Sequence, residues 1–374
     1  MKRVEGKYST AKIFTDNVDD ASIAQVKTLC DMPYAKDSHI RMMPDIHAGA
    51  GCTIGTTMQV KDKICPNLVG VDVACGMLVV QLEDKRIDLP KLDSIIKNNI
   101  PSGFSIREKT HKFARDSRID ELKFPFEYVK AQRAIGSLGG GNHFIAIEQE
   151  NDGTNYLIIH TGSRNIGKLT AEYYQKKAYE ITQSYDDPEI KNIPYELAFV
   201  EREMFDEYIE AMRILEDYSD LNRVAIADVI IDKMHLHEVS RFTTIHNYID
   251  TDKMILRKGA IDASRGKVCI IPMNMRDGSL ICVGNGNADW NYSGPHGAGR
   301  VMSRSQARKS LTVSAFKKEM KGIYSTTIDD STIDEAPEAY KDISSILEDV
   351  VDSVDVLYQI KPIYNFKHSK YIRK

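Results

Sequence analysis

The stretch from Arg265 to Arg304 constrains the fold and the chemistry of this chain more than any other. Two short apolar runs come first, at Val268–Ile271 and Leu280–Val283, with a polar turn between them. Continuous apolar runs of this length, bounded by turn residues, predict a pair of buried strands. A loop rich in glycine and asparagine follows, so the strands should deliver that loop to one edge of a sheet.

The loop leads into a histidine, His296, that is surrounded by residues with special backbone properties. Pro295 stiffens the chain before the histidine, whereas Gly297 and Gly299 let the backbone approach a ligand closely. The residues after Arg300 have a helix-forming composition. A loop-to-helix junction suits an anion such as phosphate, because free backbone N–H groups point there. A tight turn with an incidental histidine is an equally good interpretation of this pattern alone.

Length and composition allow one sizeable core. The chain has 374 residues, 42% of them hydrophobic, and a formal net charge of −4. A nucleic-acid site would therefore have to be local rather than spread over the molecule. No apolar run approaches the roughly 20 residues that span a bilayer, and the first residues lack the apolar segment of a signal peptide. Six cysteines without a Cys-x-x-Cys pair favour a reducing compartment. These features predict a cytoplasmic protein that does not bind membranes.

The pattern along the chain predicts an α+β protein, with mixed β-sheets around a pocket and helical insertions, formed by a single domain over residues 1–374. Strands are expected at Lys12–Phe14, Ile145–Ile147, Tyr156–Ile159 and Lys361–Lys367. Helices are expected at Ala21–Leu29, over much of 88–135, over 168–223, at Val224–Met234 and at Ile343–Ile360.

Five glycine-rich stretches share one sequence pattern: the end of a predicted strand, nearby glycines, and a side chain that can bind metal. They present Asp72 and Cys75, His143, His160, His246 and His296. A mixed set of oxygen, sulfur and nitrogen donors suits zinc, manganese, iron or cobalt rather than magnesium or calcium. A thiolate could bridge two such ions. Each histidine by itself is more often a hydrogen-bonded structural residue than a ligand, and we treat the remaining ones as structural: His39, His111, His235, His237 and His368.

Arginines accompany the candidate ligands. Arg164 follows His160, while Arg300 and Arg304 follow His296. The guanidinium fork matches phosphate oxygens. Basic residues continue to Lys321, and this basic strip could follow a nucleic-acid backbone. A solvated helix face is an equally good interpretation of it.

These motifs resemble the RtcB-type RNA ligases. The matching segments are MPDIHAGAGCTIG, GVDVACGM, GGGNHF, HTGSRNIG, YSDLNR, the His246-Asn247 pair, RKGA, MNMRDGSLICVG, PHGAGRVMSR and KPIYNFK. They occur in the family's order and cover nearly the whole chain. The resemblance implies a distinctive single α+β domain that joins an RNA 3′-phosphate or 2′,3′-cyclic phosphate to a 5′-hydroxyl, using GTP and manganese, in RNA repair or tRNA splicing.

The resemblance also implies roles for individual positions. His296 would become guanylylated, and Cys75 would bridge two Mn²⁺ ions, one completed by Asp72 and His143 and the other by His160 and His246. The nucleotide and RNA contacts implied are Asp45, Asn142, Arg164, Asn247, Gly278, Ser279, Gly297, Gly299, Arg300, Arg304 and Lys367, with Asp45 near the triphosphate and Lys367 on guanine. The partners implied are RNA and GTP, with room for an activating helper protein; we expect a monomer.

Two departures from the family leave alternatives open. The family has Glu where this chain has Ala146, and Glu148 lies two residues further on. That acid is thought to help hold guanine, so a metal-dependent RNA cyclic phosphodiesterase or phosphatase with weak or no ligase activity is the main alternative. The chain is also shorter than typical members, which suggests a compact branch. A non-catalytic RNA-binding protein would need neither His296 nor the full ligand set.

Overall fold

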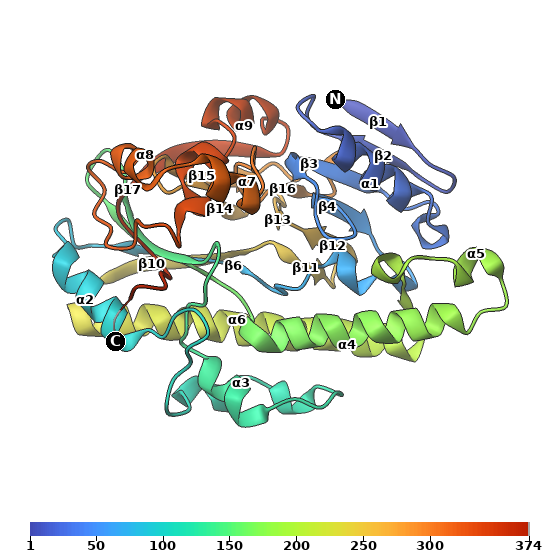
Figure 1. Cartoon of the computed structure of the whole chain (residues 1–374), viewed down its shortest axis with the longest axis horizontal. Helices are drawn as coiled ribbons and strands as arrows, with labels where there is room; N and C mark the ends of the chain where they lie inside the picture. The colour runs from blue at the N-terminus through green and yellow to red at the C-terminus, as the bar shows by residue number, and fades with distance from the viewer. Residues whose placement is uncertain (373–374) are drawn as a thin grey trace.

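The computed structural model describes residues 1–372, and two larger sheets dominate it (Figure 1). One sheet has six strands in the order β1-β2-β3-β4-β12-β11, which is antiparallel except for the β2–β3 pair. Its strands are β1 (Lys2–Glu5), β2 (Thr10–Ile13), β3 (Ile40–His47), β4 (Ile54–Gln59), β12 (Ile255–Lys258) and β11 (Asn247–Asp250). Helix α1 (Asp20–Cys30) packs on β1, β2 and β3, close to the expected Ala21–Leu29.

The second sheet has seven antiparallel strands in the order β10-β6-β8-β7-β17-β15-β14. Its strands are β10 (Glu238–Ile245), β6 (Gly76–Leu82), β8 (Asn155–Thr161), β7 (Phe144–Gln149), β17 (Val354–Lys367), β15 (Gly278–Gly284) and β14 (Val268–Asn274). The paired apolar runs expected after Arg265 are β14 and β15, with Ile270 opposite Ile281. Two-stranded pairs of β13 (Ala260–Asp262) with β16 (Ser293–Pro295), and β5 (Lys63–Ile64) with β9 (Val200–Glu201), complete the strands.

Two long helices run side by side beneath the sheets, α4 (Arg164–Gln183) and α6 (Glu203–Met234) (Figure 1). The sequence predicts one helical stretch over 168–223 and a separate helix at Val224–Met234. This prediction places the helix boundaries wrongly. Pro188 and Pro194 interrupt the first stretch, and the short α5 (Pro188–Lys191), a 3₁₀ turn and β9 lie between the long helices. From Glu203 to Met234 there is neither proline nor glycine, so one helix continues through Val224.

The predicted helix at Ile343–Ile360 is also wrong beyond its first turns. Helix α9 (Ile343–Asp349) is short, and the chain then enters β17, whose fourteen residues begin at Val354. Residues from Val354 fit a strand as well as a helix by local pattern, and pairing with β15 on one side and β7 on the other decides for the strand. β17 thereby joins the two halves of the seven-stranded sheet.

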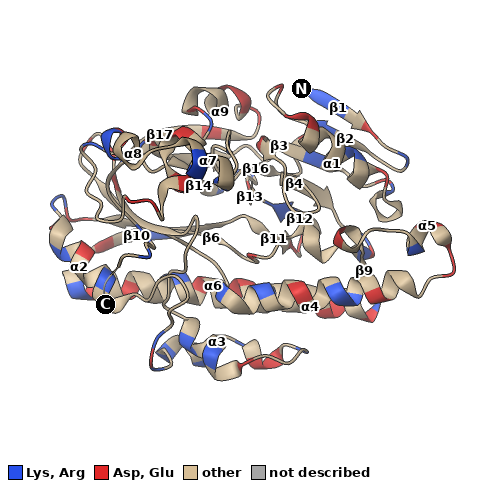
Figure 2. Ribbon diagram, in the orientation of Figure 1, with Lys and Arg blue, Asp and Glu red and all other residues tan. Residues whose placement is uncertain are grey.

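The other helices are short. They are α2 (Leu89–Asn99), α3 (Tyr128–Ala134), α7 (Arg304–Ser310) and α8 (Val313–Glu319). The segment 88–135 is thus less helical than expected, because turns and 3₁₀ helices separate α2 from α3. Basic and acidic side chains are interspersed along α4 and α6 (Figure 2), so neither helix presents a face of a single charge. Among residues 1–372, no helix is both long and apolar enough to cross a membrane.

Candidate active site

The register of the seven-stranded sheet brings distant residues to one edge. Gly76, the first residue of β6, lies opposite both Thr161 at the end of β8 and Ile245 at the end of β10. Phe144, the first residue of β7, lies opposite His160. The residues beside these strand ends, Cys75, His143 and His246, therefore meet at the same edge. The backbone N–H of His246 donates to the carbonyl of Cys75 at 2.9 Å, which ties the two loops together.

Cys75 lies at the centre of the resulting donor cluster. Its Sγ is 3.4 Å from Nε2 of His143 and 3.2 Å from Nε2 of His160. The ligand atoms of Asp72, Cys75 and His143 lie within 4.8 Å of one another, and so do those of Cys75, His160 and His246. The five side chains expected to converge do so, in two overlapping groups that share the thiol. We call these five side chains the donor cluster.

The contacts of His143 place several electron-pair donors close together. Its Nδ1 lies 2.9 Å from the carbonyl oxygen of Leu138, which can only accept, so Nδ1 carries the proton. Nε2 faces Asp72 Oδ2 at 2.9 Å and the Cys75 sulfur at 3.4 Å. Electron-pair donors gathered this closely need positive charge among them, which a proton on Nε2 or a bound divalent ion can supply.

Burial tunes the same side chains toward metal binding. Burial and neighbouring charges lower the pKa of His160 and of His246 well below the ordinary value, so both rings are neutral at physiological pH. Burial and Asp72 raise the pKa of the Cys75 thiol, and a bound cation would reverse this by favouring the thiolate. Neutral imidazoles, a thiolate and a carboxylate are a donor set that fits a borderline ion such as manganese or zinc.

His296 lies beside the donor cluster and is oriented by a buried carboxylate. Its ring centroid is 4.9 Å from that of His246. Asp45 Oδ2 accepts from Nδ1 of His296 at 2.6 Å and from its backbone N–H at 3.2 Å. Asp45 is fully buried, so it lies behind the histidine rather than on a surface that could contact a triphosphate. With Nδ1 engaged, Nε2 keeps its lone pair.

The local setting of His296 differs from the expected loop-to-helix junction. His296 directly follows strand β16, and the next helix, α7, begins only at Arg304. A Cβ on Gly299, whose φ is +75°, would lie 2.7 Å from the carbonyl oxygen of Asp45. Gly299 is thus required by packing against the aspartate that orients His296, a reason the sequence did not indicate.

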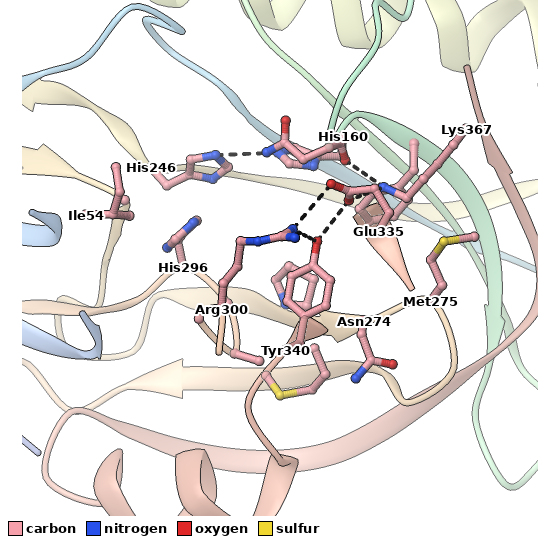
Figure 3. Close-up of a pocket in the computed structure, with 18 of the residues that line it drawn as sticks. Ile54, His160, His246, Asn274, Met275, His296, Arg300, Glu335, Tyr340 and Lys367 are labelled. Carbon is pink, nitrogen blue, oxygen red and sulfur yellow. Dashed lines mark hydrogen bonds and ion pairs between the residues drawn. The ribbon is translucent and has the colours of Figure 1, made fainter. Parts of the chain in front are cut away.

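A cavity of about 330 Å³ extends from His296 and the donor cluster (Figure 3). Met273, Met275 and Phe144 supply apolar surface, and the cavity has the size expected for a small-molecule site. The expected contact residues that line it are Asn142, Asn247, Gly278, Gly297, Gly299, Arg300, Arg304 and Lys367. Ser279 is buried beside it, whereas Arg164 lies outside it.

Several of these residues also form hydrogen bonds that stabilise the site itself. Asn247 accepts from the backbone N–H of Gly259 at 2.8 Å and donates to the carbonyl of Asp72 at 3.1 Å. It therefore fixes the loop that carries the first metal donors. Asn142 accepts from Lys367 through its backbone carbonyl at 3.0 Å, which leaves its amide group free toward the cavity.

A buried carboxylate, Glu335, organises the basic wall of the cavity (Figure 3). Lys367 Nζ donates to Glu335 at 2.9 Å, and Arg304 donates to it at 2.5 Å. Burial by itself would raise the pKa of Glu335, but Lys367, Arg304 and Arg300 lower it to about 2. Tyr340 donates its hydroxyl to the same carboxylate at 2.9 Å. The two arginines and the lysine are thus held at fixed positions by one anion.

These pairs change the interpretation of the basic strip. Arg304 and Arg308 both pair with Asp334, at 2.6 and 3.1 Å. The part of the strip nearest to His296 is therefore an internally neutralised wall of the cavity. It is neither a free track for nucleic acid nor an ordinary solvated helix face.

The structure adds residues that the sequence analysis gave no role. His47, Tyr340, Glu335, Glu148 and Asn365 all line the cavity. Glu148 Oε2 and Asn365 Oδ1 are buried, and among residues 1–372 neither atom has a hydrogen-bond partner. The only sequence signal was the position of Glu148 two residues after Ala146, which places both on the same face of β7.

Glu148 provides a test that depends on pH. Burial raises its pKa from 4.5 to about 8, and hydrogen bonding from Ser279 opposes the rise only in part. Between these pH values the folded protein holds a proton that the unfolded chain lacks, so this group makes the free energy of unfolding fall as pH rises. Glu148→Gln cannot titrate. Between pH 5 and pH 8 the free energy of unfolding of the parent should fall more than that of the variant. The expected difference exceeds about 1 kcal/mol, since a shift of one pKa unit corresponds to about 1.4 kcal/mol.

Denaturant titrations of both proteins at several pH values measure this difference, with Glu150→Gln as a control from the same segment outside the cavity. Parallel stability curves for the parent and Glu148→Gln would contradict the raised pKa.

The fold and this site define an α+β protein in which a sheet edge can hold divalent cations beside an aspartate-oriented histidine. Comparison with known proteins then identifies the family. The chain matches the family described as "tRNA-splicing ligase RtcB" over residues 25–123 and 114–368, and it belongs to this RtcB family.

Individual relatives cover most of the chain. It is 30% identical to the RNA-splicing ligase RtcB of Escherichia coli K12 over 366 aligned residues, which include 87% of this chain and 89% of the relative. It is 26% identical to the tRNA-splicing ligase RtcB of Aeropyrum pernix, with 82% of this chain and 83% of the relative covered.

Proposed function

We propose that this protein is an RNA ligase that joins a 3′-phosphate or 2′,3′-cyclic phosphate to a 5′-hydroxyl, using GTP and manganese. The observation that carries the proposal is the position of His296. Its Nδ1 is bound to buried Asp45, and its ring lies against His246 of the donor cluster. An imidazole held through Nδ1, with Nε2 left to attack, is a competent nucleophile toward phosphorus.

In the first proposed step, Nε2 of His296 attacks the α-phosphorus of GTP. A nitrogen–phosphorus bond forms, the bond from that phosphorus to the bridging oxygen breaks, and pyrophosphate leaves. Asp45 holds the Nδ1 proton and stabilises the positive charge that develops on the ring. Arg300 and Lys367 lie on the cavity wall where phosphate and base would pass, and fixed positive charge of this kind carries much of phosphoryl-transfer catalysis.

Asp72, Cys75, His143, His160 and His246 would hold the metal, as one or two ions that share Cys75. When bound, manganese would neutralise phosphate charge and act as a Lewis acid near the reacting phosphorus. The residues themselves position these charges, because the sheet register places four of the five donors and Asn247 holds the backbone carbonyl of the fifth, Asp72.

In the later proposed steps, an oxygen of the RNA 3′-phosphate attacks the guanylylated histidine. The nitrogen–phosphorus bond breaks, and the RNA end becomes capped with GMP. The 5′-hydroxyl of the second RNA then attacks the 3′-phosphorus, and GMP leaves as the new phosphodiester forms. A cyclic phosphate must first be opened by water to a 3′-phosphate.

The base of the nucleotide would lie toward the deep end of the cavity. Ala146 leaves that part of β7 without an acid, and it packs in an apolar cluster. Glu148 and Asn365 nevertheless present unpaired oxygen atoms to the cavity. They could accept the N–H groups of guanine in place of the acid that Ala146 replaces, which supports GTP as the nucleotide.

Incubation with α-³²P-labelled GTP and manganese, followed by denaturing electrophoresis, tests this proposal. A labelled band at 42.2 kDa that resists denaturation is the expected result, together with joining of a 3′-phosphate RNA to a 5′-hydroxyl RNA. RNA cyclic-phosphate opening without any covalent label would favour the second candidate, a metal-dependent phosphodiesterase or phosphatase, which Ala146 motivates. We further propose that the protein acts in tRNA splicing or RNA repair in the cytoplasm. It would act as a monomer, with or without a helper protein.

The arginines of the basic wall provide a further test. Arg300→Ala or Arg304→Ala should weaken GTP use by roughly tenfold or more, because each removes a charge-assisted contact to phosphate worth about 1.5–3 kcal/mol. Folding should survive, since Glu335 keeps Lys367 and the other arginine as partners.

The measurements are the GTP concentration needed for half-maximal labelling and the thermal unfolding midpoint. Lys318→Ala, in the exposed part of the same strip, is the matched control. Parent-like labelling and ligation by both arginine variants would mean that the wall has only a structural role.

A further inference from the structure

One motif of the sequence has no part in the proposed chemistry, the segment YSDLNR at 218–223. It lies within α6, which packs against β6 and β8, the strand that begins after Cys75 and the strand that contains His160 (Figure 1). Its last two side chains, Asn222 and Arg223, are polar and buried. Buried polar side chains need hydrogen-bond partners, so the partners of this pair indicate what the motif does.

Arg223 connects the backbone beside two of the metal donors. Its Nη1 donates to the carbonyl oxygens of Ala74 and of Thr161, each at 3.1 Å. Ala74 precedes Cys75, and Thr161 follows His160. One guanidinium nitrogen, which carries two N–H groups, therefore holds together the two segments that present the thiol and the imidazole.

The backbone at Ala74 gives this contact a specific use. Ala74 has a φ of +54°, in the left-handed region that residues with a Cβ rarely adopt. Its N–H donates to the carbonyl of Asn247 at 2.7 Å, and its carbonyl accepts from Arg223. A strained conformation of this kind persists only where surrounding contacts determine it. These two contacts hold both polar groups of the residue that precedes Cys75.

Asn222 has the same kind of contacts with the loop that leads to His143. Its Oδ1 accepts from the backbone N–H of Ser137 at 3.1 Å, and its Nδ2 donates to the carbonyl of Gly162 at 3.0 Å. The next residue, Leu138, places its carbonyl oxygen 2.9 Å from Nδ1 of His143. The adjacent pair on α6 thus contacts the loops of three of the five donors.

The hydrogen bonds of Arg223 are more useful to the donor cluster than its charge. The side chain is 1% exposed, and its ion-pair partner Asp220 lies 3.6 Å from Nη2 and is half exposed. Burial lowers the pKa of Arg223, and Asp220 opposes this effect. A cation with so little compensation would by itself repel a metal ion bound nearby. The contribution expected of Arg223 is therefore the position of the two segments that it holds.

We propose that Arg223 is a positioning residue of the donor cluster, which sets the separation of Cys75 and His160 by holding the backbone of Ala74 to that of Thr161. This inference rests on the proposed metal site, because the separation matters only if the donors share an ion. The contacts themselves belong to the folded chain without metal, so they can be tested independently of it.

Hydrogen exchange in the metal-free protein, measured by mass spectrometry of its peptides, tests the contacts directly. Arg223→Met keeps an apolar side chain of similar length and removes both hydrogen bonds. The peptides that contain Ala74 and Thr161 should then exchange roughly tenfold faster or more, because local opening no longer breaks bonds to a charged donor. Arg223→Lys keeps a cation and a shorter donor, so its exchange should lie between those of the parent and Arg223→Met.

Arg41→Met is the matched control. Arg41 is also buried and also donates to backbone carbonyls, those of Ile40 and Asp289, but it belongs to the six-stranded sheet. This variant should have a lower thermal unfolding midpoint, while the peptides that contain Ala74 and Thr161 exchange as in the parent.

Cobalt binding measures the consequence for the site. Arg223→Met should bind cobalt roughly 10- to 100-fold more weakly than the parent, as the loss of other contacts to metal ligands does, and its thiolate charge-transfer band should change at saturation. Arg223→Lys should recover part of the affinity, and Arg41→Met should bind cobalt as the parent does. If Arg223→Met does not fold, the same two measurements on Arg223→Lys decide.

Parent-like exchange or parent-like cobalt binding in the Arg223 variants, with only the thermal midpoint lowered, would overturn the inference and leave Arg223 as a core residue. Tighter cobalt binding in Arg223→Met would also overturn it, since the charge would then outweigh the position. If the parent binds no cobalt, yet the two peptides exchange faster only in the Arg223 variants, the positioning stands and the proposed metal site fails.

Discussion

His296→Gln should form no covalent GMP adduct and should lose RNA joining by at least about 10³-fold, since removing a nucleophile typically costs this much or more. Glutamine keeps a polar side chain of similar reach, but its amide cannot form a phosphoramidate. Its N–H could still donate to buried Asp45, which now accepts from Nδ1 of the histidine at 2.6 Å. The fold and the donor cluster should therefore persist, and metal content should equal that of the parent.

A second substrate sharpens this experiment. RNA whose 3′ end already carries the guanylyl cap bypasses the histidine, so His296→Gln should still join it to a 5′-hydroxyl. Labelling of the variant by GTP as strongly as the parent would mean that another residue is the nucleophile. Failure on capped RNA, with metal content intact, would mean that His296 also acts in the final step.

Cys75→Ala should lower metal affinity at least about 100-fold, since even the loss of an outer contact to a metal ligand costs 10- to 100-fold. Cys75 belongs to both groups of donors, so its loss should affect every ion that the cluster holds. GTP labelling and ligation should fall with metal occupancy. Cobalt is a useful probe, because cobalt bound by a thiolate gives a charge-transfer band that only Cys75 can supply here.

Cys269→Ala is the matched control for this variant. Cys269 is also buried, but it lies in β14 opposite Cys282, away from the donor cluster. Both substitutions remove a buried thiol, and only Cys75→Ala should remove the cobalt band and the metal. An unchanged band in Cys75→Ala would exclude the thiol as a ligand and leave the cluster as a hydrogen-bonded core.

Much of the site was predictable because its residues occur in short motifs with strong local constraints. Glycines beside Asp72, His143 and His296 indicated backbone near a ligand, and the apolar runs around them indicated strands that end there. The helix errors have the same local origin. Periodicity alone could not show that α6 continues through Val224 or that the chain after Asp349 becomes a strand, since neighbouring strands decide the second case.

The sequence by itself determined the chemistry that is available: the family, the α+β class, and the identities of the donors, the histidine and the arginines. Only the tertiary structure decided how these groups act on one another. Pairing register, set by contacts between residues far apart in the chain, brings Cys75, His160 and His246 to one sheet edge. Burial then sets their charge states, places Asp45 behind His296, and pairs Arg304 with Glu335. Desolvation and distance control these effects, and neither is defined until the chain has folded.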